Sequence, residues 1–142
     1  MASIKQITEF AELTLLLDSM VKSQVNFDRR FPTDMTEVEI AGWLIELYGA
    51  GCLFFAEQYP DGELKFFSVI EAKSKTATWH ILFSHPRFKY KTKTVLNEIK
   101  DELRAKGVTT ILSRTRRVTP SYKRFMSSIE SYPFEIVYKC KL

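Results

Sequence analysis

The sequence lacks several features that define large classes of proteins. Its 142 residues contain no apolar run near the roughly 20 residues that a membrane-spanning helix needs. The first residues are followed at once by the acidic Glu9 and Glu12, which is unlike a signal peptide. No repeat, low-complexity tract or Gly/Ser-rich linker interrupts the chain. We therefore expect one domain over residues 1–142, with no membrane partner.

Cysteine and histidine are also scarce. The chain has two of each, and no group of them has the spacing of a zinc site. Cys52 and Cys140 both lie in apolar, strand-like runs, so we expect the reduced and buried thiols of a cytoplasmic protein. The sequence thus predicts no metal centre.

The residues that are present have the balance of a globular protein. The apolar share is 45%, the charged share is 27% and the net charge is +4. The charge is unevenly distributed, since residues before Lys73 hold most of the acid and the region from Arg87 to Arg124 holds most of the base. Such a basic region either binds phosphate-bearing or acidic partners or is a solvated surface, and the sequence leaves both open.

The spacing of apolar residues predicts the element order β-α-α-β-β-β-α-β-α-β. A first helix begins after Thr8 and is interrupted from Asn26 to Pro32, and a second begins at Asp34 or Thr36 and ends at Gly49. Strands are expected at 4–7, 52–59, 63–72, 76–84, 108–113 and 134–140, and the last two helices at about 93–106 and from Pro120 to Ile129. This order requires a central mixed, mostly antiparallel sheet with helices on both faces, a mixed α/β fold.

A basic turn without glycine follows the predicted strand at 76–84. The turn Lys89-Tyr90-Lys91-Thr92-Lys93-Thr94 lies where a phosphate group would meet the N-terminus of the next helix. Its lysines provide the positive charge that such a site needs. Glycine, which would let the backbone approach a phosphate closely, is missing.

With this turn in place, the element order resembles that of the GNAT superfamily, the Gcn5-related N-acetyltransferases. In that family, an Arg/Gln-x-x-Gly-x-Gly/Ala turn binds the pyrophosphate of acetyl-CoA, and the matching residues here are Lys89, Thr92 and Thr94. The resemblance implies a coenzyme site made of Lys89, Lys91, Thr92, Lys93 and Thr94. Because threonine replaces both glycines, it leaves open whether acetyl-CoA binding is retained or lost.

The resemblance also implies a catalytic acid and a catalytic base. Active relatives use a tyrosine to protonate the departing thiolate; Phe125 stands near that position, so Tyr122, one turn earlier, is the substitute. In the family, a strand carboxylate or an ordered water removes the proton of the amine. Glu57, Glu71 and His80 are the candidates on predicted strands. His80 is the best placed, and an ordinary histidine pKa of about 6.5 suits the task.

A closer similarity is to the small GNAT-like internal virion proteins of short-tailed bacteriophages. It is carried by Trp79, by the glycine-free loop from Arg87 to Lys93, and by the stretch from Ser121 to Ile129 with the pattern Ser-x-x-Arg-Phe-x-x-x-Ile. This resemblance implies a virion or infection-accessory protein with little or no catalysis, whose partners are phage or host proteins. It would act in the cytoplasm of a bacterial host or be packaged in the virion.

Three functions therefore stay open: a phage-type protein that has lost catalysis, a working N-acetyltransferase on a protein or small amine, and a nucleic-acid-binding module. The third would use one basic face on which Phe88, Tyr90 and Tyr122 could stack against bases. Besides the lysines of the turn, the residues of this face are Arg87, Arg114, Arg116, Arg117, Lys123 and Arg124.

Overall fold

A computed structural model of the chain describes residues 5–27, 36–88, 91–113, 124 and 126–128. Its centre is a five-stranded sheet with the spatial order β1-β2-β3-β4-β5. Strands β1 to β4 pair antiparallel with one another in sequence, whereas β4 and β5 are parallel. The strands are β1 (Gln6–Ile7), β2 (Leu53–Gln58), β3 (Leu64–Lys73), β4 (Thr76–Ser84) and β5 (Thr110–Ser113).

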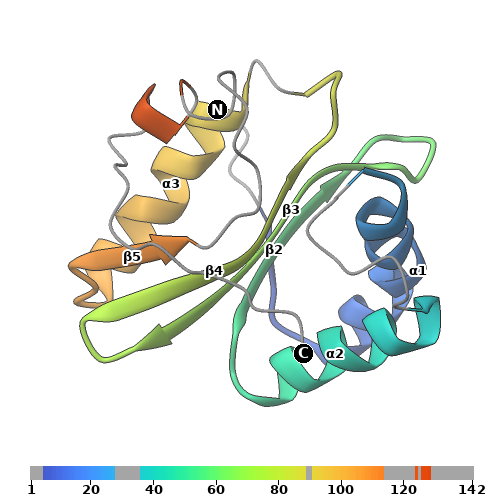
Figure 1. The fold of residues 1–142 in the computed structure, drawn as a ribbon, viewed down its shortest axis with the longest axis horizontal. Helices are drawn as coiled ribbons and strands as arrows, with labels where there is room; N and C mark the ends of the chain where they lie inside the picture. Colours follow the sequence, from blue (N-terminus) through green and yellow to red (C-terminus); the bar gives the residue numbers. More distant parts are fainter. Residues whose placement is uncertain (1–4, 28–35, 89–90, 114–123, 125, 129–142) are drawn as a thin grey trace, which may run out of the picture.

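The helices α1 (Phe10–Phe27), α2 (Glu37–Gly49) and α3 (Thr92–Ala105) flank this sheet. Figure 1 shows α1 and α2 on one side of the sheet and α3 on the other. Helix α3 connects the parallel strands β4 and β5, because parallel neighbours need a long crossover between them. No helix in the described part of the chain combines the length and the apolar character that crossing a bilayer would need.

Each face of the sheet has its own apolar core, because successive side chains of a strand point to opposite faces. On the face covered by α1 and α2, Phe54 and Phe67 are fully buried with ring centroids 6.2 Å apart. Their sequence neighbours Phe55 and Phe66 are fully buried on the α3 face. There they belong to one cluster with Trp79, Val95, Leu96, Ile99 and Leu103.

Helix α2 begins with a capping box. The Thr36 hydroxyl accepts a hydrogen bond from the Glu39 N–H at 3.2 Å, and the Glu39 carboxylate accepts one from the Thr36 N–H at 3.3 Å. The helix ends at Gly49, and Gly51 then has φ +87°, which glycine adopts without strain. This turn leads directly into Cys52 and β2.

The substitution Thr36→Ala is expected to lower the free energy of unfolding by about 1 kcal/mol, because it leaves the Glu39 N–H without its side-chain acceptor. Urea unfolding followed by circular dichroism would measure the change. Thr36→Ser, which keeps the hydroxyl, is the matched control and should retain most of the stability. Equal losses in both variants would show that the methyl group, and not the cap, is responsible.

The predicted fold class and element order are confirmed for the described residues. Strand β4 has the predicted bounds, and the Thr36 start of α2 is confirmed. The predicted start of the interruption at Asn26 is wrong, because α1 continues to Phe27, and the rest of the predicted interruption lies outside the described residues. Asparagine lowers helix propensity only modestly, and Pro32 restricts chiefly the residue just before it. The predicted strand at 134–140 and most of the predicted helix after Pro120 lie outside the described residues.

Candidate active site

His80 is positioned by an irregularity in the pairing of β3 with β4. The register is Val69↔Ile81 on one side of it and Ile70↔Trp79 on the other, so β4 contains one extra residue, His80, between these two pairs. Val69 and Ile81 belong to the core under α1 and α2. A β-bulge of this kind changes the direction of a side chain. Here it lets His80 lie on the same face as Ile81, toward Trp43 of α2.

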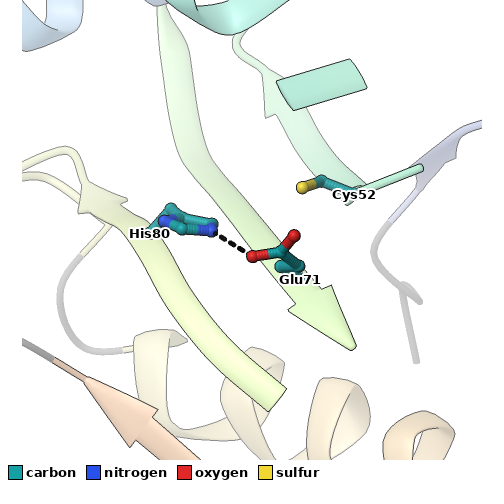
Figure 2. Close-up of side chains that lie close together, drawn as sticks. All are labelled: Cys52, Glu71 and His80. Carbon is teal, nitrogen blue, oxygen red and sulfur yellow. Dashed lines mark hydrogen bonds and ion pairs between the residues drawn. The ribbon is translucent and has the colours of Figure 1, made fainter. Parts of the chain in front are cut away.

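The imidazole of His80 meets the carboxylate of Glu71 on the neighbouring strand, as Figure 2 shows. Nε2 of His80 lies 3.2 Å from Oε1 of Glu71, and each side chain is 25% exposed. The hydrogen bond with His80 lowers the pKa of Glu71 below its ordinary value, with help from Lys73 at 3.4 Å. A carboxylate that stays ionised beside the ring can orient the imidazole through this hydrogen bond.

Two further side chains surround this pair. The ring of Trp43 on α2 meets His80 in a T-shaped contact, with centroids 6.5 Å apart. Cys52 is 6% exposed, and its sulfur lies within 4.8 Å of donor atoms of both Glu71 and His80. Burial raises the pKa of the Cys52 thiol to about 11, so the group is a neutral thiol near pH 7 and no thiolate nucleophile. The prediction of a buried, free Cys52 is confirmed, whereas Cys140 lies outside the described residues.

Cys52 is accordingly expected to resist alkylation. In a Cys140→Ser background at pH 8, iodoacetamide should modify the folded protein about a hundredfold more slowly than the unfolded protein. A pKa of about 11, against 9.0 for an ordinary cysteine, lowers the thiolate fraction by about that factor, and burial slows access further. Mass spectrometry over time would give both rates. Equal rates would show that the thiol is neither buried nor shielded.

The start of α3 forms the second part of the candidate site. Lys91 occupies the N-cap position without a side-chain cap, and the first turn contains no acidic residue. Lys91, Lys93 and Thr94 are exposed. Thr92 is only 4% exposed, and its hydroxyl lies 2.6 Å from the hydroxyl of Ser84 at the end of β4. The helix start therefore carries the charge and dipole that favour an anion, but the Thr92 hydroxyl is already engaged.

A pocket of ≈ 300 Å³ opens beside this helix start. Arg87 and Lys65 lie over the Tyr59 ring, at 4.5 and 5.2 Å from its centroid. Both cations are also paired, Arg87 with Glu63 at 2.7 Å and Lys65 with Glu57 at 3.2 Å. Lys91 pairs with no carboxylate in the described part of the chain. Of the three cations that line the pocket, it is therefore the most available to bind an anion. The residues that line the pocket are Tyr59, Lys65, Arg87, Phe88 and Lys91.

The pocket includes residues that sequence reasoning missed. Tyr59 and Lys65 come from the turn after β2 and the start of β3, and their alternation with apolar residues is typical of any half-buried strand. Nothing in that pattern links them to the turn before α3. Only the adjacency of the start of β3 to the end of β4, with Phe66 opposite Ser84, brings them there.

The structure brings some of the predicted site residues together and separates others. His80 and Glu71 are in contact, whereas Glu57 lies near the other end of β2. The charge of Arg87 is shared with Glu63 and, at 3.9 Å, with Asp61, and Arg124 is exposed. The remaining predicted residues lie outside the described part of the chain: Lys89, Arg114, Arg116, Arg117, Tyr122 and Lys123.

Several solved acetyltransferases have the same architecture as this chain. An acetyltransferase from Trypanosoma brucei has a TM-score of 0.68 at 13% identity, covering 99% of this chain and 100% of that chain. Glucosamine-6-phosphate N-acetyltransferase from Arabidopsis thaliana has a TM-score of 0.62 at 14% identity, covering 99% of each chain. An aminoglycoside N-acetyltransferase solved with CoA has a TM-score of 0.68 at 13% identity, covering 99% of this chain and 93% of that chain. No protein-family model and no curated protein matches the sequence.

The chain therefore has the fold of the GNAT acetyltransferases, as the element order predicted. Two features of its described part bear on a possible function. One is the His80–Glu71 pair at the bulge of β4, and the other is a start of α3 that carries Lys91, Thr92, Lys93 and Thr94.

Proposed function

We propose that this chain is an acetyl-CoA-dependent N-acetyltransferase in which His80, oriented by Glu71, accepts the proton of the acceptor amine. The observation that carries the proposal is the 3.2 Å contact between these two side chains. It occurs next to Trp79, where the described parallel pairing of β4 with β5 ends. The GNAT fold, which the aminoglycoside acetyltransferase solved with CoA shares, supports the choice of coenzyme.

Acetyl transfer to an amine requires that the protein orient the two substrates and provide one proton acceptor. Acetyl-CoA would supply an activated acetyl group as a thioester. As the amine attacks, a C–N bond forms, the C–S bond breaks, and the nitrogen must lose a proton. The neutral His80 ring can accept that proton, and the ionised Glu71 stabilises the imidazolium that results. Tyr122, the predicted proton donor to the sulfur, stays part of the proposal.

The residues at the start of α3 fit the phosphates of the coenzyme. Lys91 and Lys93 are exposed there, the first turn of α3 contains no acidic residue, and Lys91 at the N-cap makes no side-chain cap. Lys89 and Thr94 complete the proposed set. Thr92 would contribute through its backbone N–H, because its hydroxyl is engaged with Ser84. Charge attraction therefore replaces the close backbone approach that glycine would permit.

Acetyl-CoA titration and turnover test this proposal. The protein should bind acetyl-CoA in calorimetry and release CoA when incubated with a panel of primary amines and peptides. The double variant Lys89→Ala/Lys91→Ala should raise the KM for acetyl-CoA several-fold, about tenfold if both charges contact phosphate. Lys106→Ala is the matched control, an exposed lysine at the other end of α3, and should leave the KM unchanged. If the protein shows no binding and no turnover at millimolar acetyl-CoA, the proposal is rejected.

One observation favours a second candidate, a phage-type virion or infection-accessory protein that has kept the fold and lost catalysis. Threonine stands at position 92, where the family has glycine, and its buried side chain is bonded to Ser84. Such a protein would act through surface contacts with phage or host proteins. Co-purification with a phage particle, together with no detectable acetyl-CoA binding, would support this candidate, whereas tight binding of acetyl-CoA would exclude it.

A further inference from the structure

Three potential metal ligands meet on the α2 side of the sheet. Cys52 directly precedes β2, Glu71 lies near the end of β3, and His80 is the bulge residue of β4. Leu53 of β2 pairs with Ile70 of β3, and Ile70 pairs with Trp79 of β4. Cys52, Glu71 and His80 each directly adjoin one of these paired residues, so they lie close together across the three strands. Because of the bulge, His80 shares a face with Glu71. In a regular pairing continued from Val69↔Ile81, His80 would lie opposite Ile70 and on the other face of the sheet.

The placement of Cys52 is determined by the turn that ends α2. Gly51, at φ +87°, donates its N–H to the carbonyl of Tyr48, and the Cys52 N–H donates to the carbonyl of Leu47 at 3.1 Å. These bonds hold the backbone at the point where the chain enters the sheet. Figure 2 shows the sulfur of Cys52 pointing toward the space between Glu71 and His80.

The distances suit a common ligand. One donor atom from each residue, a sulfur, a carboxylate oxygen and a ring nitrogen, lies within 4.8 Å of the others. Glu71 and His80 are each 25% exposed, so an ion can reach the cluster from solvent, while the sulfur is buried at its inner end. Among the described residues, Lys73 lies 3.4 Å from Glu71 and is 80% exposed, so an incoming ion can displace it at little cost.

We propose that Cys52, Glu71 and His80 bind a single divalent cation of the zinc class. A thiolate, an imidazole and a carboxylate form a ligand set that zinc prefers and that magnesium and calcium do not. On binding, the sulfur releases its proton to solvent, and the two negative charges of thiolate and carboxylate balance the charge of the ion. Three protein ligands leave a fourth, open position.

Occupation of this site has a consequence for the proposed acetyl transfer, and that consequence rests on the proposed function. A histidine nitrogen bound to a metal ion has no lone pair with which to accept a proton. Zinc should therefore inhibit an enzyme that uses His80 as its base. The binding of the ion does not depend on catalysis and is measured without it.

Cobalt(II) is the probe for the test, because thiolate ligation to this ion gives a near-ultraviolet charge-transfer band and tetrahedral sites give visible bands. The full chain, reduced and freed of metal with a chelator, is titrated anaerobically with cobalt chloride. We expect both sets of bands to saturate at one equivalent, and zinc chloride to abolish them. Glu71→Gln should weaken cobalt binding at least about tenfold, since losing even an indirect partner of a metal ligand costs that much.

The chain provides matched controls, since it has two cysteines and two histidines. Cys52→Ser should remove the charge-transfer band and His80→Ala the visible bands, whereas Cys140→Ser and His85→Ala should keep both. Circular dichroism of each variant reports whether it is folded, and Glu71→Gln, at a partly exposed position, remains informative if Cys52→Ser unfolds. No saturable band in the wild-type chain, or a charge-transfer band that persists in Cys52→Ser and disappears in Cys140→Ser, would overturn the proposal.

Discussion

His80→Ala is expected to lower the kcat of acetyl transfer by about a hundredfold or more, with little change in the KM for acetyl-CoA. The substitution removes the side chain that accepts the amine proton and leaves the start of α3, where the coenzyme phosphates would bind, untouched. Steady-state release of CoA, measured with saturating amine in the presence of a chelator, gives both constants.

Two carboxylate variants separate the proposed base from a general loss of charge. Glu71→Gln should lower kcat less than His80→Ala does, because the amide still contacts the ring but no longer stabilises the imidazolium. Glu57→Gln alters a strand carboxylate that pairs with Lys65 near the other end of β2, and it should leave kcat unchanged. A kcat for His80→Ala within twofold of the wild type would remove His80 from the mechanism.

Phe67→Ala is expected to lower the free energy of unfolding by about 3–5 kcal/mol. The ring is fully buried in the middle of β3 and packs against Phe54, in the core that holds α1 and α2 on the sheet. Removing it creates a cavity that the surrounding strands cannot close. A loss of this size is a large part of the total stability of a typical domain, so the variant should unfold at much lower urea concentration.

Phe10→Ala is the matched control for Phe67→Ala. Phe10 is 50% exposed at the start of α1, and its ring centroid lies 5.9 Å from that of Tyr48. We expect it to cost about 1 kcal/mol or less, because little apolar surface returns to water. Similar costs for both variants would mean that the α1/α2 core contributes less to stability than its burial indicates.

Much of the fold was predictable because its elements have strong local signals. The alternation of residues in β4 gave its bounds without error, and Thr36 with Glu39 marked the start of α2. The end of α1 was not predictable in the same way, since Asn26 only weakly disfavours helix. Strand and helix order then restricted the topology, because a crossover through α3 makes β4 and β5 parallel.

The candidate site was also predictable only in part from the sequence. The lysine-rich turn before α3 was visible in the sequence, because consecutive residues supply both its charge and its helix start. That Thr92 would turn inward to Ser84 was not visible, since the contact depends on how the end of β4 meets the helix. Glu71 and His80 were predicted as separate candidates for one role, and the structure makes them partners.

The sequence by itself determined the period of each element, the charge of the turn and hence the class of fold, because these depend on neighbours along the chain. Tertiary structure alone decided that Cys52, Glu71 and His80 meet. Their spacing in the chain matches no metal-binding or catalytic pattern, and their convergence depends on the register of three strands and on one extra residue in β4. A bulge shifts which side chains share a face, and no local pattern in the sequence reports where it occurs.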